Sequence, residues 1–572
     1  MFLERAYFCY YVHMGRIRLL SFIILGVAAL FIVRLYFLQI VNNRIYVDKA
    51  EHQYSDQVNG IFDRGTIFFT SKVGELVSAA TLKTGYTIAI NPQIVKDPET
   101  TFTKLSAIIP LERTAFMAKA GKKNDPYEEI AKQVDENIGK QIIALNLPGV
   151  AAYENRWRFY PAGDVAANSI GFMGFQGDVY AGRYGLERQY NATLSRDSRA
   201  YVNFFAEIFS NIKQAAASEN EGDIVTTIEP SVQSFLQEEL VKINKKYSSQ
   251  YTGGIIMDPK TGEIFAMGVE PSFDLNNTKT VKDVSTFSNP LVENVYEMGS
   301  IIKPLTVAAG IDLGKITADT TYNDPGFIYS NGKKISNFDG KARGLTTIQI
   351  ALGQSLNVGM AHIVATIGND AFTNYMYAFG LNQKSGIDLP NEAASLTANL
   401  KSNRDLEHFT ASFGQGIALT PVATVRALSA LANGGVLVTP HVVKSVHYKI
   451  GINKDVSYPA QSRAIKPETA TEVSRMLVYD VDHILRNGAL KMPNYSIAAK
   501  TGTAQIATGG GYSADDFLHS FVGYFPAYDP KFIIFLYTYE PRGVQYSSES
   551  LTDPFFDVVK FLINYYNVTP DR

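Results

Sequence analysis

A single apolar segment near the start of the chain constrains its fold more than any other feature. Residues 19–33 carry no charge, and only Arg34 separates them from the apolar residues 35–38. A helix of about twenty residues, rising about 1.5 Å per residue, spans the hydrocarbon core of a bilayer. The long side chain of Arg34 can reach the interface. We therefore predict one transmembrane helix at about 19–38, because no later segment is comparably long and apolar.

The residues that flank this segment predict its orientation. Arg5, Arg16 and Arg18 precede it, opposed only by Glu4, which favours a cytoplasmic N-terminus. No small-x-small cleavage site follows it, so we expect an uncleaved anchor rather than a signal peptide; a buried core helix is the alternative. We expect a single-pass protein of the cell (inner) membrane, with everything after about residue 43 outside the cytoplasm. The only cysteine, Cys9, precedes the segment, which agrees with this topology.

The rest of the chain has the composition of an ordinary globular protein. The whole chain has 572 residues, 46% of them hydrophobic and 12% aromatic, which suggests about two to four folded domains. The 53 basic side chains nearly balance the 55 acidic ones, so we do not expect a nucleic-acid partner. One cysteine permits neither an internal disulfide nor a cysteine-based zinc site, and we expect no metal and no cofactor.

Three parts are predicted along the chain. Residues 1–43 form the cytoplasmic tail and the anchor. Residues 44–220 form an irregular, β-rich and non-catalytic domain, the pedestal, with a strand near 87–90 and a charged helix near 127–139. A stretch rich in Ala, Ser, Glu and Asn at 214–222 is typical of a linker. Residues 221–572 form the domain that carries the chemistry.

The last domain combines strands at both of its ends with helices in the middle. Two apolar runs flank Pro259-Lys260-Thr261-Gly262 and predict a hairpin, and two more at 520–525 and 532–539 are joined through Asp529-Pro530. Between them, apolar periodicity predicts helices at about 301–314, 361–379, 421–433 and 467–487. We predict an α+β fold with one antiparallel sheet, closed by the two ends of the domain and flanked by helices.

A serine and a lysine open the first of these helices. Ser300-Ile301-Ile302-Lys303 begins a buried apolar stretch, and side chains three residues apart lie on the same helix face. Serine is a weak nucleophile until a base removes its proton, and a desolvated lysine beside a second cation can have a pKa low enough to do so. Pro304 has no N–H to donate, so we predict a distorted first turn.

Short motifs of this kind also occur by chance, and their context separates one set from the others. Ser355-Leu356-Asn357 lies between two apolar helical runs, and Lys500-Thr501-Gly502-Thr503 ends a strand-like run at 497–499. The order S-x-x-K, S-x-N, K-T-G is that of penicillin-binding proteins and class A β-lactamases. We interpret the remaining matches as a hairpin turn at Lys260, a strand boundary at Lys83, polar surface at Ser210 and Ser330, and a chance match at Ser218.

Further segments extend the resemblance over nearly the whole chain. In these segments as well as in the three motifs, the chain is similar to class B penicillin-binding proteins, which are monofunctional peptidoglycan D,D-transpeptidases. The similarity favours division-type over elongation-type members. It rests on Arg158-Phe159-Tyr160-Pro161, Gly185-Leu186-Glu187, Phe413-Gly414-Gln415-Gly416-Ile417, Thr420-Pro421, Leu431-Ala432-Asn433-Gly434-Gly435 and Ser520-Phe521-Val522-Gly523, and loosely on Asp63-Arg64-Gly65-Thr66-Ile67.

The resemblance implies a catalytic role for five residues. Ser300 would attack the carbonyl of the penultimate D-Ala of a stem peptide and form an acyl-enzyme, with Lys303 as the base. Ser355 would pass a proton to the departing D-Ala amine, and Asn357 would hold Lys303 and the substrate amide. Lys500 would supply positive charge.

The resemblance also implies the binding residues and the partners. Thr501 and Thr503 would bind the terminal carboxylate, and Gly502 would let the substrate backbone come close. The backbone N–H groups of Ser300 and Thr503 would form the oxyanion hole. The expected partners are stem peptides ending in D-Ala-D-Ala, β-lactams, a membrane glycosyltransferase and other cell-wall synthesis proteins.

Several alternatives remain open from the sequence. An elongation-type transpeptidase would act in the lateral wall rather than at the septum. A catalytically idle scaffold would not react at all. A β-lactamase or D,D-carboxypeptidase would pass the acyl group to water, and a β-lactam sensor would need more membrane spans. Class A β-lactamases use a glutamate-held water for deacylation, whereas the candidates here are typical of loops or solvated helices: Glu392, Glu407, Glu468 and Glu472.

Overall fold

The computed structural model describes residues 25–26, 63–177, 179–196, 221–458, 462–509 and 511–572. The predicted transmembrane segment lies outside these residues except for 25–26, and the predicted linker lies outside them except for its last two residues. Among the described residues, the structure contains no helix with the length and apolar character needed to cross a membrane.

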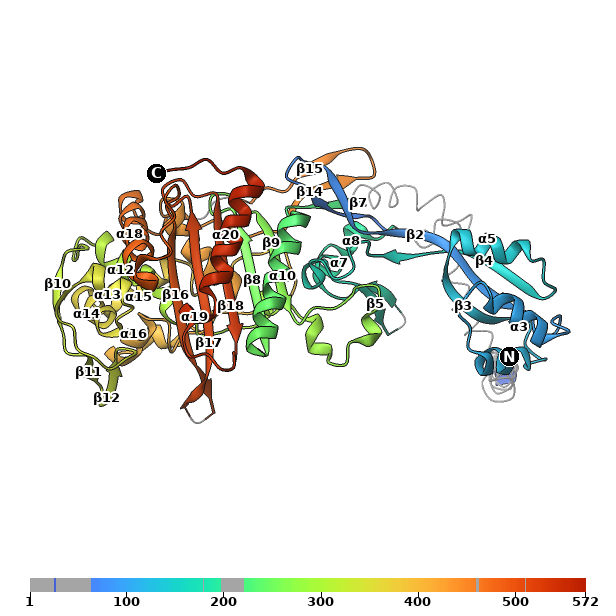
Figure 1. Cartoon of the computed structure of the whole chain (residues 1–572), viewed down its shortest axis with the longest axis horizontal. Helices are drawn as coiled ribbons and strands as arrows, with labels where there is room; N and C mark the ends of the chain where they lie inside the picture. Colours follow the sequence, from blue (N-terminus) through green and yellow to red (C-terminus); the bar gives the residue numbers. More distant parts are fainter. Residues whose placement is uncertain (1–24, 27–62, 178, 197–220, 459–461, 510) are drawn as a thin grey trace, which may run out of the picture. The chain divides into compact units, whose positions relative to one another are not determined.

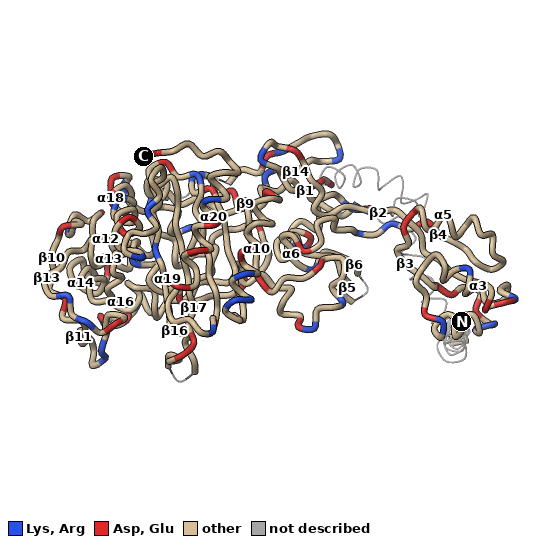
Figure 2. Tube along the Cα trace, viewed as in Figure 1, with Lys and Arg blue, Asp and Glu red and all other residues tan. Residues whose placement is uncertain are grey.

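Two compact units make up the described chain (Figure 1). The smaller one contains residues 84–157, and the larger one contains 64–83, 158–196 and 221–572. The segment 44–220, predicted to be one domain, thus contributes to both units. Basic and acidic residues are interspersed along the described chain (Figure 2).

The smaller unit packs three helices against three paired strands. The second half of β2 (Leu76–Ile90) pairs with β3 (Glu128–Asp135), and β4 (Val150–Phe159) also pairs with β2. Its core includes Ile88 and Phe116. The helices are α3 (Pro98–Ser106), α4 (Arg113–Ala120) and α5 (Glu136–Ala144).

Two predictions for this part of the chain are wrong. The charged stretch at 127–139 is mostly strand β3, and helix α5 begins only at Glu136. Pairing with β2, for example of Ile88 with Ala131, outweighs the helix propensity of the charged residues. Lys83-Thr84-Gly85 does not mark a strand boundary, because it lies inside β2.

A small mixed sheet opens the larger unit. Strand β1 (Ile67–Thr70) pairs antiparallel with the first half of β2 and parallel with β7 (Gly222–Thr226). Strand β7 continues to β14 (Val443–Tyr448) and β15 (Asn453–Asp455). The chain returns to this unit at residue 158 and then forms these short elements: α6 (Ala167–Ile170), β5 (Met173–Gln176), β6 (Val179–Gly182), α7 (Gly185–Gln189) and α8 (Asn191–Leu194).

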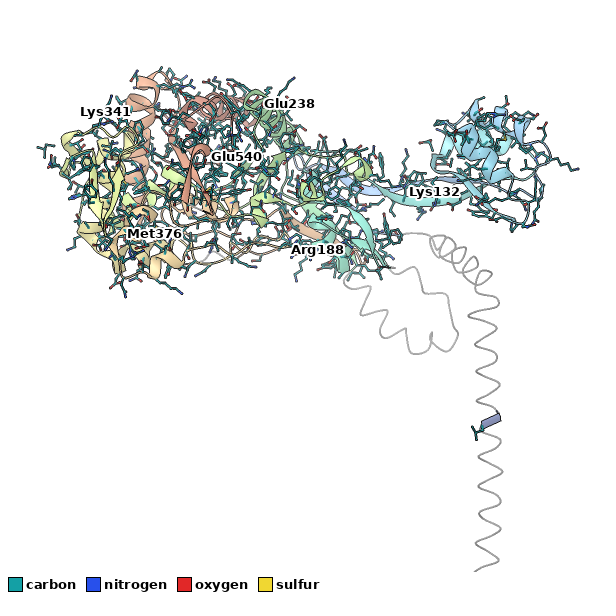
Figure 3. All side chains as sticks on the ribbon, turned by 90° about the horizontal axis from the view of Figure 1, so that it is seen from below. Lys132, Arg188, Glu238, Lys341, Met376 and Glu540 are labelled. Atoms are coloured by element: carbon teal, nitrogen blue, oxygen red, sulfur yellow. The ribbon has the colours of Figure 1, made fainter. Side chains whose placement is uncertain are left out.

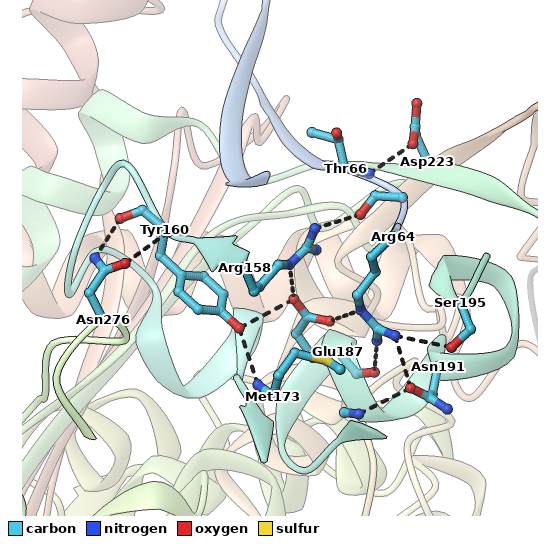
Figure 4. Close-up of polar contacts among 12 residues, drawn as sticks. Arg64, Thr66, Arg158, Tyr160, Met173, Glu187, Asn191, Ser195, Asp223 and Asn276 are labelled. Atoms are coloured by element: carbon cyan, nitrogen blue, oxygen red, sulfur yellow. Dashed lines mark hydrogen bonds and ion pairs between the residues drawn. The ribbon is translucent and has the colours of Figure 1, made fainter. Parts of the chain in front are cut away.

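A buried ion cluster joins three of the segments singled out in the sequence (Figure 4). Glu187 accepts hydrogen bonds from Arg64 Nε at 2.7 Å and from Arg158 Nε at 2.6 Å, and all three side chains are buried. Arg158 also donates to the carbonyl of Gly65. Removing one partner from such a cluster leaves an uncompensated buried charge, so these residues hold the segments together.

A five-stranded antiparallel sheet forms the centre of the larger unit, in the order β16–β17–β18–β8–β9. The predicted sheet closed by both ends of the domain is confirmed, including the hairpin around Lys260. The bounds of the strands are β8 (Tyr251–Met257), β9 (Ile264–Glu270), β16 (Ala498–Thr508), β17 (Gly511–Phe525) and β18 (Phe532–Tyr539).

Strand β18 shows why the sheet carries a layer on each face. Seven of its eight residues are buried, because successive side chains point to opposite faces. Ile534 and Leu536 belong to the core that includes helices α10 (Pro230–Tyr247) and α20 (Thr552–Tyr566). The alternate residues face the helical half of the unit, where the labelled Met376 is fully buried (Figure 3).

The helical half contains the predicted helices, two of them interrupted. The predicted helix at 361–379 is divided at Gly368, whose φ is +87°, and the one at 467–487 ends its α-helical part at Tyr479. A π-helical turn, η6 (Asp480–Ile484), and a 3-10 turn, η7 (Leu485–Gly488), follow. The other elements are η2 (Thr278–Thr280), η3 (Val284–Phe287), α11 (Pro290–Glu293), η4 (Gly299–Ile302), α12 (Lys303–Asp312), β10 (Thr321–Asp324), β11 (Phe327–Ser330), β12 (Lys333–Ser336), β13 (Gly344–Thr347), α13 (Ile348–Gly353), α14 (Asn357–Ile367), α15 (Asn369–Ala378), η5 (Ala398–Lys401), α16 (Asp405–Ala411), α17 (Pro421–Ala432), α18 (Pro467–Tyr479) and α19 (Ser547–Ser550).

Candidate active site

The segment that carries Ser300 has the predicted distorted first turn. It forms the 3-10 turn η4, in which the N–H of Lys303 donates to the carbonyl of Ser300, and helix α12 begins only at Lys303. Pro304 occupies the position where a missing N–H costs least. The prediction from Pro304 is therefore confirmed.

Close backbone contacts hold this turn in place. Gly299 has a φ of +63°, and its N–H donates to the carbonyl of Gly414 at 3.1 Å. A Cβ on Gly414 would stand 2.2 Å from the carbonyl oxygen of Gly299, so only glycine fits there. The Ser520 hydroxyl donates to the carbonyl of Met298 at 2.9 Å. Segments 413–417 and 520–523 thus position the turn.

Ser355 occupies a backbone position that usually belongs to glycine. Its φ is +57°, and it follows the end of helix α13 as the left-handed residue of a Schellman motif. Its own N–H donates to the carbonyl of Leu352, and the N–H of Leu356 donates to that of Ala351. A non-glycine residue in this conformation costs about 1 kcal/mol or more. Such local strain is typical of functional sites.

Both motif lysines converge on the Ser355 hydroxyl. Lys303 Nζ donates to Ser355 Oγ at 3.1 Å and to the Ser355 carbonyl at 2.5 Å. Lys500 Nζ donates to the same Oγ at 3.1 Å and to the carbonyl of Thr501 at 3.1 Å. Three segments separated by 52 and 145 residues therefore meet at one hydroxyl.

The two lysines are poorly solvated and close to each other. Lys303 is 0% exposed and Lys500 is 5% exposed. Burial, together with the charge of Lys500, holds the pKa of Lys303 well below its usual value. Burial also lowers the pKa of Lys500 to about 8, although the nearby carboxylate of Asp480 raises it. A neutral lysine is thus accessible at neutral pH.

The Ser300 hydroxyl is half-buried and lies one short turn before Lys303. Within the described residues it makes no hydrogen bond. Hydrogen bonds of a catalytic group often form only when substrate binds, so the geometry is compatible with a nucleophile beside a buried base.

The K-T-G motif lies inside a strand rather than at the end of one. The strand-like run at 497–499 continues through the motif, because β16 extends from Ala498 to Thr508. β16 is an edge strand of the five-stranded sheet, and an edge strand can pair with an extended peptide. Thr501 and Thr503 are both half-buried. Thr503 Oγ1 accepts a hydrogen bond from the N–H of Ser547.

Two other predicted site residues have contacts that the sequence did not indicate. A Cβ on Gly502 would lie 2.4 Å from Ser520 Oγ and 2.8 Å from the Met298 carbonyl, so this glycine allows close packing of β16 against the Ser300 turn. Asn357 Nδ2 donates to the carbonyl of Ser336 at 2.9 Å. No hydrogen bond links Asn357 to Lys303 in the part of the chain that the structure describes.

The remaining motif matches lie elsewhere. Lys260 is in the β8–β9 turn, and Ser330 and Lys333 flank the turn between β11 and β12. Ser330 is buried, so the prediction that it lies on the polar surface is wrong. Ser210 and Ser218 lie outside the described residues. The four glutamates considered for deacylation are either exposed or engaged locally: Glu468 is exposed, Glu407 and Glu472 pair with Arg404 and Arg475, and Glu392 accepts from the N–H groups of Ser385 and Gly386.

Sequence reasoning missed two polar residues behind the site, Asp480 and Gln349. Asp480 is 4% exposed, and Gln349 Nε2 donates to it at 3.1 Å. The available signal was an acidic residue inside an apolar helical run that also contains Met476 and Leu477. In the described residues no group of three or more His, Cys, Asp or Glu side chains could hold a metal ion.

Two protein-family models match this chain. The family model for the penicillin-binding protein transpeptidase domain matches residues 252–559, which is over half of the chain. The model for the penicillin-binding protein dimerisation domain matches residues 63–202. The chain belongs to the penicillin-binding proteins. Together the two matches give the class B arrangement, a dimerisation domain followed by a transpeptidase domain.

Relatives of this penicillin-binding protein are similar over most of its length. Stage V sporulation protein D of Bacillus subtilis (strain 168) is 28% identical over 92% of this chain and 82% of its own. Peptidoglycan D,D-transpeptidase FtsI of Buchnera aphidicola subsp. Schizaphis graminum (strain Sg) is 25% identical over 94% and 93%. The crystal structure of penicillin binding protein 2X from Streptococcus thermophilus, at 20% identity, has a TM-score of 0.72 over 89% of this chain and 81% of its own, which supports the fold.

Proposed function

We propose that this penicillin-binding protein is a serine-type peptidoglycan D,D-transpeptidase that cross-links stem peptides in septal cell-wall synthesis. The observation that carries the proposal is the convergence of Lys303 and Lys500 on the hydroxyl of Ser355, with Lys303 directly after the short turn that contains Ser300. Relatives named as the peptidoglycan D,D-transpeptidases FtsI and PenA, each 25% identical over most of the chain, support the division-type assignment.

Acylation begins with the hydroxyl of Ser300. Neutral Lys303 takes its proton while Oγ attacks the carbonyl of the penultimate D-Ala. The oxyanion is held by the backbone N–H groups of Ser300 and Thr503. The peptide bond then breaks, and Ser355 passes a proton from the lysines to the amine of the departing D-Ala. An ester between the stem peptide and Ser300 remains.

Transfer of the acyl group reverses these roles. An amine from a neighbouring stem attacks the ester and loses a proton through the same groups, and the Ser300 hydroxyl is restored as the new amide forms. The edge strand β16 is suited to hold the donor peptide, with Thr501 and Thr503 at its terminal carboxylate. The glycan strands that carry these peptides must come from another enzyme, so we propose a membrane glycosyltransferase as a partner, which co-purification would test.

A β-lactam should leave a long-lived ester on Ser300. Its leaving group stays tethered after the ring opens, and the four glutamates considered above are exposed or engaged in local contacts. We expect the acyl-enzyme to persist for many minutes at neutral pH, as a mass increment on the peptide that contains Ser300. Mass spectrometry of the penicillin-treated full chain over time checks this.

Other outcomes of that experiment separate the alternatives. Rapid turnover of penicillin with recovery of the unmodified chain would identify a hydrolase. A chain that never reacts, although correctly folded, would support the idle scaffold.

We also propose that residues 19–38 anchor the chain in the cell membrane and that the catalytic domain lies outside the cytoplasm. The uncharged run at 19–33 and the basic residues before it support this topology. We expect a truncated chain that begins at Arg44 to be soluble and still acylated by penicillin. If it stays in the membrane fraction, a second membrane contact exists and the single-anchor topology is wrong.

A further inference from the structure

A buried carboxylate lies behind the candidate active site without a full set of partners. Asp480, the first residue of the π-helical turn η6, is 4% exposed. Its Oδ1 accepts a hydrogen bond from Gln349 Nε2 at 3.1 Å, whereas Oδ2 has no hydrogen-bond partner among the described residues. A buried carboxylate is costly unless it is paired, so its retention here calls for a counter-charge.

The same contacts connect Asp480 to the turn that holds Ser355. Gln349 lies in α13, and its amide nitrogen also donates to the carbonyl of Met476 in α18 at 3.1 Å. At the end of α13, a Cβ on Gly353 would stand 2.5 Å from Asp480 Oδ1. The backbone that leads into Ser355 is therefore packed directly against the carboxylate.

The nearby cation is Lys500. Strand β16, which carries it, contacts the turn η6 that begins with Asp480. Burial lowers the pKa of Lys500 and raises the pKa of Asp480 well above its usual value. Their mutual attraction opposes both shifts, because the charge of Asp480 raises the pKa of Lys500 and the charge of Lys500 lowers the pKa of Asp480.

The two lysines compete for protons at the Ser355 hydroxyl. Lys303 and Lys500 each donate to Ser355 Oγ at 3.1 Å, and two ammonium groups so close together in a buried site repel each other. A negative charge on Asp480 acts on Lys500, so it would favour the proton on Lys500 over the proton on Lys303.

We propose that Asp480 is a positioning residue of the active site: its carboxylate is the counter-charge that keeps Lys500 protonated, so that Lys303 can serve as the base. This inference rests on the proposed acylation of Ser300. The charges that face Lys500 are Asp480 from η6 and Lys303 from α12. On the same turn as Asp480, Asp482 pairs with Arg572 and His483 stacks on Tyr479.

The test is the pH dependence of acylation of the full chain by a fluorescent penicillin, from about pH 6 to about pH 10. In the unaltered chain, the second-order rate constant should fall near pH 8 as Lys500 loses its proton. Asp480→Asn keeps the size and the acceptor for Gln349 but removes the charge. Because Asp480 raises the pKa of Lys500, its loss should move this decrease to lower pH, by about one unit or more.

Matched variants separate this effect from a structural one. Asp482→Asn makes the same change two residues away and should leave the pH profile in place. In Lys500→Arg the cation cannot lose its proton in this range, so the decrease should vanish and Asp480→Asn should no longer affect it. If Asp480→Asn does not fold, Asp480→Ser provides the same uncharged comparison.

The outcomes distinguish the two proposals. If the unaltered chain is not acylated at all, the proposed function fails. If it is acylated and the decrease near pH 8 stays where it is in the folded Asp480 variants, the proposed function stands and the counter-charge role of Asp480 is overturned. A shift of equal size in Asp482→Asn would also overturn it.

Discussion

Replacement of Ser300 by alanine should abolish covalent labelling of the full chain by a fluorescent penicillin. The change removes the one oxygen that forms the ester, so no partial reaction remains. The side chain is half-buried and makes no hydrogen bond within the described residues, so the melting temperature should change little. Gel fluorescence and thermal unfolding measure the two properties.

The chain provides its own control for this variant. Ser330 is also followed by a lysine three residues later, but it lies in the β11–β12 hairpin, and Ser330→Ala should label as the unaltered chain does. Undiminished labelling of Ser300→Ala would show that another residue is the nucleophile.

Replacement of Lys303 by glutamine should slow acylation by about 10²- to 10⁴-fold, the usual contribution of a general base. Lys303 can act as a base only when neutral, and burial with the Lys500 charge keeps its pKa well below the usual value. In the unaltered chain the rate should therefore rise with pH as Lys303 loses its proton, and then fall near pH 8. In Lys303→Gln the rising part should disappear. Acylation reactions that are stopped after different times, over a series of pH values, measure both the rate constant and its pH profile.

Lys315→Gln is the matched control, because Lys315 is exposed just after the same helix. It should retain the rate and the pH profile. A loss smaller than tenfold in Lys303→Gln, with the rising part intact, would assign the base to another group.

Much of the fold follows from local patterns. Apolar runs on both sides of Lys260 and of Asp529 predicted the hairpins of the central sheet, because a buried strand needs apolar residues on both faces. The prediction failed at 127–139, where charged residues form strand β3. There the pairing with β2 provides a stabilisation that a window of sequence does not contain.

The sequence by itself determined the motif set, the order of its members and the distorted turn at Pro304, because each of these depends on residues close together in the chain. Only the tertiary structure decided that Lys303 and Lys500 share the hydroxyl of Ser355 and that the turn beginning with Asp480 contacts the strand that carries Lys500. The charge state of a buried side chain depends on which distant segments surround it. Packing of the whole domain brings those neighbours together. They are too far apart in the sequence for a local pattern to indicate the contact.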